Sequence, residues 1–140
     1  MKLETWPWYN CLAWAFAQVL DIRLPYRYGK YILNSKFPLS ESFIQKVSEF
    51  AISVIQVNSL EELRDFKFGF LVYGFFLEEI REGSYTDYRY SGFHVVLYHE
   101  GALFHQNGCG VMPTTTSMKE LQKSEYHNPL YFAVVPKEQA

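Results

Sequence analysis

Residues 92–107 read GFHVVLYHEGALFHQN, and this stretch predicts two antiparallel strands joined by a tight turn at His99-Glu100-Gly101. Side chains alternate between the two faces of a strand. One face of the first strand should therefore carry His94, Val96 and Tyr98, and the other face Val95, Leu97 and His99. On the second strand, His105 and Asn107 point to one side and Gln106 to the other. We expect His105 or Asn107 to lie within reach of the His94 ring.

A cysteine, Cys11, stands upstream of this stretch at the start of an amphipathic helix that we expect from about Asn10 to Ile22. Asn10 is a good N-cap residue because its side chain can accept from N–H groups of the first turn. Leu24-Pro25 then ends the helix. Because the N–H groups and the dipole of a helix start favour a thiolate, this position predicts a lowered pKa for the Cys11 thiol.

The rest of the chain predicts an α+β fold. A second helix should follow Pro38, with Ser40 or Ser42 as its cap and an inner face of Phe43, Ile44, Val47, Phe50 and Ala51. Further expected elements are a strand over residues 53–57, a short helix opened by the capping-box sequence Ser59-Leu60-Glu61-Glu62, a central strand over 70–77, a loop or protruding hairpin over 78–91, a short helix opened by Ser117, and a last strand over 130–135. This order indicates one domain over residues 1–140, with helices first and an antiparallel sheet last.

Composition excludes several classes of protein. The chain has 140 residues, of which 49% are hydrophobic and 20% charged, as in a folded domain. A net charge of −2 without a Lys/Arg run gives no signature of nucleic-acid binding. Two cysteines without a Cys-x-x-Cys motif predict neither a disulfide framework nor a zinc ribbon. Since the sequence shows no secretory signal and no span of roughly 20 apolar residues, we expect synthesis in the cytoplasm, with a phage virion or an exported effector as its setting.

The chemistry that these residues favour is nucleophilic catalysis by a thiol. An imidazole beside Cys11 would take its proton and prepare it to attack a carbonyl. A third group that accepts from the His94 ring would orient that imidazole, and His105 and Asn107 are both candidates. The alternatives are a buried structural thiol with ordinary strand histidines, and a zinc site of Cys11, His94, His105 and Cys109. That set lacks the closely spaced ligand pairs of most zinc sites.

Three segments, taken in order, resemble the NlpC-type cell-wall hydrolases, a branch of the papain-like cysteine peptidases. Asn10-Cys11-Leu12-Ala13, with its exit at Leu24-Pro25, is similar to the family's Asp-Cys-Ser-Gly helix. Residues 68–72, FGFLV, are similar to its Gly-Asp-led strand. Residues 94–98 (HVVLY), residues 103–105 (LFH) and Gly110-Val111 resemble its His strand, its second-His strand and the Gly-Val that follows.

The resemblance implies a fold and a role for each matching residue. The fold would be papain-like, with an N-terminal Cys-bearing helix packed on a central antiparallel sheet. Cys11 would be the nucleophile, His94 the general base and acid, and His105 the orienting third member, with Asn107 as the alternative because papain itself uses an Asn. The oxyanion site would lie at the helix start, where the Cys11 backbone N–H is joined by Tyr9 and Asn10.

The function implied by the resemblance is hydrolysis of amide bonds in peptidoglycan stem peptides through a thioester acyl-enzyme, without cofactor or metal. The alternatives are a papain-like effector or deamidase that acts on a protein, and a non-catalytic phage or assembly module. The expected partner is a peptidoglycan peptide or another peptide, not nucleic acid or membrane, with an inhibitor or immunity protein as an open alternative. Cys109 is expected to be an inert loop thiol, or else to pair reversibly with Cys11 on oxidation.

Overall fold

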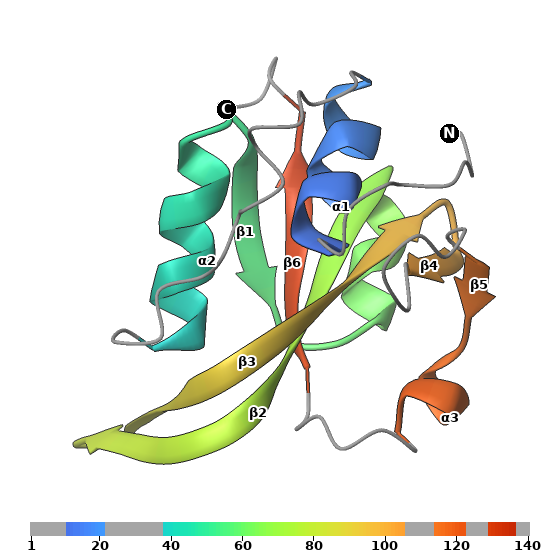
Figure 1. The fold of residues 1–140 in the computed structure, drawn as a ribbon. Coiled ribbons are helices and arrows are strands. Elements are labelled where there is room, and N and C mark those ends of the chain that lie inside the picture. Colours follow the sequence, from blue (N-terminus) through green and yellow to red (C-terminus); the bar gives the residue numbers. More distant parts are fainter. Residues whose placement is uncertain (1–10, 22–37, 106–113, 123–128, 137–140) are drawn as a thin grey trace.

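The chain forms a six-stranded antiparallel sheet with helices on both faces (Figure 1). A computed structural model describes residues 11–21, 38–105, 114–122 and 129–136. The strand order is β1-β6-β2-β3-β4-β5, so the strand expected at the sheet centre, β2, lies there. The strands are β1 (Ser53–Val57), β2 (Phe68–Glu82), β3 (Tyr85–His99), β4 (Ala102–His105), β5 (Thr114–Thr116) and β6 (Leu130–Val135). The helices are α1 (Cys11–Leu20), α2 (Leu39–Ser48), the 3₁₀ helix η2 (Glu61–Asp65) and α3 (Met118–Leu121).

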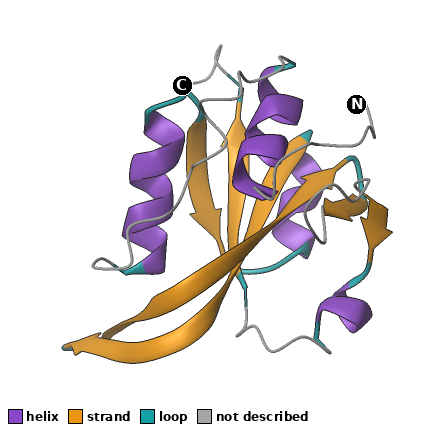
Figure 2. Cartoon of the chain, viewed as in Figure 1, coloured by secondary structure: helices purple, strands orange, loops and turns teal. Residues whose placement is uncertain are grey.

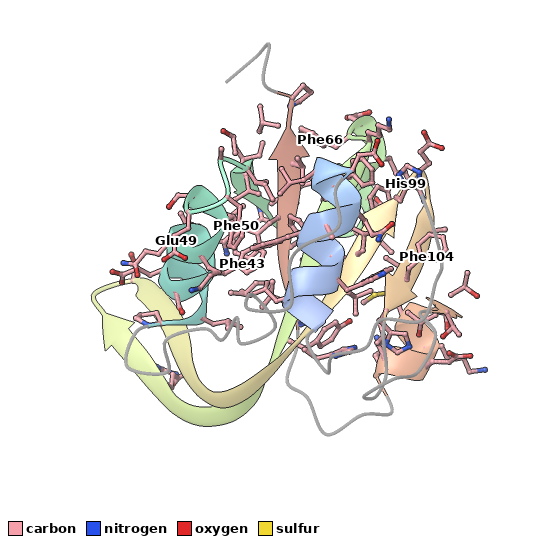
Figure 3. All side chains as sticks on the ribbon, turned by 45° about the horizontal axis from the view of Figure 1, so that its top comes forward. Phe43, Glu49, Phe50, Phe66, His99 and Phe104 are labelled. Atoms are coloured by element: carbon pink, nitrogen blue, oxygen red, sulfur yellow. The ribbon has the colours of Figure 1, made fainter. Side chains whose placement is uncertain are left out.

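The first face of the sheet is covered by α1 and α2 (Figure 1). Its core is built on aromatic rings: Phe43 of α2 lies 4.6 Å from Phe132 and 5.5 Å from Phe70, measured between ring centroids. Phe16 of α1 lies 5.5 Å from Phe70 and 5.1 Å from Phe50, and Phe43 and Phe50 are labelled in Figure 3. Val95 and Leu97 of β3 complete this first-face core.

The second face carries a smaller core that η2 and α3 help to build. It contains apolar side chains together with two tyrosines, and its buried members are Leu63, Leu71, Tyr73, Val96, Tyr98, Leu103, Leu121 and Ala133. Since Val95 and Leu97 belong to the first face and Val96 and Tyr98 to the second, the alternation expected along this strand is confirmed.

Strands β2 and β3 extend beyond the sheet as a long twisted arm (Figure 2). β6 pairs with β2 only over Gly69–Val72, and β4 pairs with β3 only over Leu97–His99. From Phe75 to Gly92, the arm, no third described strand joins the pair. Irregular pairing between Phe75 and Glu78 bends the arm away from the sheet. The hairpin expected over residues 78–91 is therefore present, as an extension of the two central strands.

Other expectations are corrected by local chemistry. Pro38, and neither Ser40 nor Ser42, occupies the N-cap of α2; both serines lie inside the helix and are buried. Ile44 is 43% exposed instead of facing inward, and Ala51 falls beyond the helix end with a positive φ of 57°. The Ser59 capping box is wrong, since Leu60 is the N-cap of η2 and makes no side-chain bond.

Two turns and one strand complete the comparison with the sequence. Glu100 and Gly101 both have positive φ, as a two-residue hairpin turn of type I′ requires, and the tight turn expected there is confirmed. Ser117 caps α3, as predicted, by accepting from the Glu120 N–H. Strand β5 was not predicted, because three consecutive threonines carry no hydrophobic alternation. Among the described helices, none has the length and apolar character that crossing a membrane requires.

Candidate active site

His94 lies on β3 at the root of the arm. Its strand partner is Tyr73, the first residue of β2 beyond the segment that β6 covers. The alternation of β3 turns His94 to the second face, with Val96 and Tyr98, and its side chain is buried with 4% of the residue exposed. A buried imidazole at this position is held in one orientation by its neighbours.

The rings of His94 and His105 are in contact. His94 Nε2 and His105 Nδ1 lie 2.9 Å apart, a hydrogen-bond distance, with the ring planes inclined by 73°. The β3–β4 register explains the contact: Leu97 pairs with Phe104, so His105 falls opposite Val96 and one diagonal step from His94. The contact expected between the two strand histidines is therefore present.

Both rings are neutral near pH 7. Burial, and to a lesser extent the neighbouring His105, lower the pKa of His94 from 6.5 to about 4. Burial also lowers the pKa of His105, while the carboxylate of Glu120 acts in the opposite direction. A neutral His94 can accept a proton from another group, which a protonated ring cannot do.

Tyr73 forms the wall beside His94. Its hydroxyl donates to the Sδ atom of Met118 in α3 at 3.7 Å. Burial, and secondarily Tyr131, raise the pKa of the Tyr73 phenol, so that the phenol stays neutral over the physiological range. The surroundings of the histidine pair are thus apolar or neutral on the sheet side, and the nearest charged group identified is Glu120.

Cys11 is the first residue of α1, as the sequence indicates, although its side chain is outside the described part of the structure. The following residues Leu12, Ala15 and Phe16 belong to the first-face core with Val95 of β3. The helix and the His94 ring therefore lie on opposite sides of β3. A thiol at Cys11 would meet His94 round the edge of β3, beyond the end of β4 at His105.

Four expected residues lie outside the described residues: Tyr9, Asn10, Asn107 and Cys109. Their contribution to an oxyanion site, the choice between Asn107 and His105 as third member, and the pairing of Cys109 with Cys11 stay predictions. Within the described residues, no group of three or more His, Cys, Asp or Glu side chains is arranged to hold a metal ion. The proposed zinc ligands His94 and His105 instead share a direct hydrogen bond.

Sequence reasoning missed two neighbours of the histidine pair. Tyr73 was expected only as part of a central strand, and Glu120 only as part of a capping box, in which the carboxylate reaches back to the N-cap N–H. In the structure Glu120 Oε2 instead accepts from Thr116 Oγ1 at 3.3 Å. The available signal for Tyr73 was its polar hydroxyl in an otherwise apolar strand.

Searches of protein-family models, of curated proteins and of solved structures find no match to this chain.

Proposed function

We propose that this protein is a papain-like cysteine hydrolase that cleaves amide bonds, with Cys11 as nucleophile, His94 as general base and acid, and His105 as the orienting residue. The observation that carries the proposal is the 2.9 Å contact between His94 Nε2 and His105 Nδ1. This contact engages Nε2, and Nδ1 on the other side of the ring is the atom that would serve the thiol. The order of a base and its orienting partner is that of a catalytic triad.

The reaction follows from these atoms. His94 Nδ1 takes the proton from the Cys11 thiol, and the thiolate attacks the carbonyl carbon of an amide to form a tetrahedral oxyanion. When the oxyanion collapses, the C–N bond breaks and the amine leaves with the proton from His94. Water, deprotonated by His94, then attacks the thioester, and a carboxylic acid and the free thiol are released.

The neutral state of His94 suits this sequence of steps. With its pKa lowered to about 4, the ring is unprotonated at pH 7 and is ready to act as a base. The site would therefore operate by proton transfer from the thiol when substrate binds, more than by a resting ion pair. A negative thiolate beside the ring would raise the pKa of His94 as the proton moves.

The substrate that we propose is the peptide stem of peptidoglycan, which follows from the resemblance of residues 94–98 and 103–105 to the NlpC-type hydrolases. The test is incubation of wild type, Cys11→Ala and His94→Gln with defined muropeptides, and identification of the products by mass spectrometry. We expect cleavage by wild type, none by Cys11→Ala, and a loss of about 10²–10⁴ in kcat for His94→Gln. Products that persist in Cys11→Ala would overturn the proposal.

Thiol reactivity tests the link between Cys11 and His94 directly, because the two lie on different sides of β3. Cys109→Ala leaves Cys11 as the one cysteine, and its alkylation rate can be followed against pH. We expect His94→Gln to shift this profile and His99→Gln, a strand histidine on the first face, to leave it unchanged. Identical profiles in all three backgrounds would show that no catalytic pair exists.

The arm favours a second candidate, a hydrolase or deamidase that acts on a protein substrate. Strands that run about ten residues past the sheet are longer than a small peptide substrate needs, and His94 lies at their root. A variant in which residues 77–91 are replaced by a short turn separates the two candidates. Muropeptide cleavage should survive this change, whereas cleavage or deamidation of a protein substrate should be lost.

A further inference from the structure

The histidine pair can work as a base and its orienting partner in one tautomeric state only. His94 Nδ1 is a base when its ring carries the proton on Nε2 and donates it to His105 Nδ1. His105 must then keep its own proton on Nε2, on the side of the ring away from His94. A hydrogen bond in the opposite direction, from His105 Nδ1 to His94 Nε2, would put a proton on His94 Nδ1 and block it as a base. Some group has to favour the first arrangement.

The sheet shows which side that group must occupy. β4 lies between β3 and β5, so His94 approaches His105 from the β3 side and the far side of the ring faces β5 and α3. The β4–β5 register pairs His105 with Thr114 and Leu103 with Thr116. These four side chains therefore share the second face, and Thr116 lies one pleat from His105.

Glu120 is held on this side by its surroundings. Its Oε2 accepts from Thr116 Oγ1 at 3.3 Å, and its backbone N–H donates to the capping oxygen of Ser117. The next residue, Leu121, is buried in the second-face core with Leu103, which anchors α3 against the sheet. The carboxylate thus stands near the second face of β4, on the side of His105 that His94 does not occupy.

We propose that Glu120 is a positioning residue for His105, whose negative charge favours the tautomer with the proton on Nε2 and keeps Nδ1 as the acceptor for His94. The catalytic meaning of this arrangement rests on the proposed hydrolase function, while the tautomer itself does not. The groups that face or adjoin His105 are His94 from β3, Thr114 from β5 and Glu120 from α3, where the exposed Lys119 precedes Glu120. The electrostatic effect of Glu120 on His105 has the sign that the proposal requires, since it opposes the lowering of the pKa by burial.

The test is the tautomer and titration of His105, measured by long-range ¹H–¹⁵N correlation spectra of the full chain against pH. We expect the Nε2–H tautomer in wild type. Glu120→Gln should populate the Nδ1–H tautomer and lower the pKa of His105 by up to about one unit. Glu120→Asp should keep the wild-type state because it keeps the charge. Glu61→Gln, which removes an exposed carboxylate from η2, is the matched control and should change neither quantity.

Activity supplies the second readout. If the proposed function holds, Glu120→Gln lowers kcat with little change in KM, and Glu120→Asp restores most of it. Identical His105 spectra in wild type and Glu120→Gln, or an equal change in Glu61→Gln, would overturn the positioning role. Cleavage that does not depend on Cys11 would instead overturn the hydrolase function, and the His105 spectra would still decide the role of Glu120.

Discussion

The two faces of the sheet differ in what they bury. The first face packs phenylalanine rings of α1, α2, β2 and β6 against one another, with centroids 4.6–5.5 Å apart. The second face buries leucines together with Tyr73, Tyr98 and His94, and is covered by the short helices η2 and α3. One sheet therefore separates two tasks: the first face supplies most of the apolar stabilisation, and the second holds polar groups in fixed positions at the cost of packing.

Truncation of a ring on the first face should have the largest effect on stability. Phe132 is fully buried and contacts Phe43, so Phe132→Ala should lower the free energy of unfolding by about 3–5 kcal/mol. On the second face, Tyr73→Phe removes only the hydroxyl that donates to Met118, and should cost no more than about 1 kcal/mol. Urea denaturation monitored by circular dichroism measures both.

Equal losses in these two variants would contradict the division between the faces. Phe132→Leu is the control for side-chain volume, because it keeps an apolar group in the site and should fall between the other two. A large loss in Tyr73→Phe alone would mean that the hydroxyl contact to Met118 organises the second face.

The sequence predicted the sheet centre well for a physical reason. Residues 93–99 and 130–135 combine apolar alternation with clear turn signals, and a strand buried on both faces has few alternatives. The contact of His94 with His105 followed from the same alternation and a two-residue turn. What remained hidden depends on distant packing: Ile44 continues the apolar pattern of α2 yet lies exposed, because the helix rotates to bury Leu39, Phe43 and Val47.

The side of the sheet that α1 covers was equally hidden. Residue alternation shows that His94 and Val95 face opposite ways, and it cannot show which of these faces the helix will take. The structure places α1 against Val95, so that the Cys11–His94 pair of the proposed triad has to form at the edge of β3. Glu120 escaped for a related reason, because its link to Thr116 depends on the unpredicted strand β5.

The pH dependence of stability should belong to the second face. The pKa of His94 is about 4 in the folded chain and near 6.5 when unfolded, so the unfolded chain binds more protons between these values. Stability is therefore complete above about pH 6.5 and is lost as the pH falls toward 4, by up to about 3 kcal/mol. The lowered pKa of His105 acts in the same direction.

The measurement is the free energy of unfolding at a series of pH values in wild type and His94→Gln. The variant should lose the greater part of the slope between pH 4 and 6.5, even if its stability at pH 7 is lower. Phe132→Leu on the first face should keep the wild-type slope at reduced stability. A slope that His94→Gln leaves intact would assign the acid sensitivity to other groups.

A smaller effect is expected where β2, β6 and η2 meet on the second face, at Gly69. A Cβ atom at this position would lie 2.8 Å from Leu63 Cδ2 and 3.0 Å from the carbonyl oxygen of Phe132. Leu63 is fully buried and the carbonyl belongs to the sheet backbone, so neither can move without disturbing its neighbours. Gly69→Ala should therefore destabilise the fold by about 1–3 kcal/mol.

A double-mutant cycle shows how much of this cost comes from the η2 side chain. Leu63→Ala alone leaves a cavity and should destabilise by about 2–5 kcal/mol. Because it also removes the Leu63 atoms nearest the new Cβ, the double variant should be more stable than the sum of the single effects predicts. Strict additivity would mean that the Phe132 carbonyl alone opposes the alanine. The close packing of Gly69 would then be a property of the β2–β6 backbone and not of the second face.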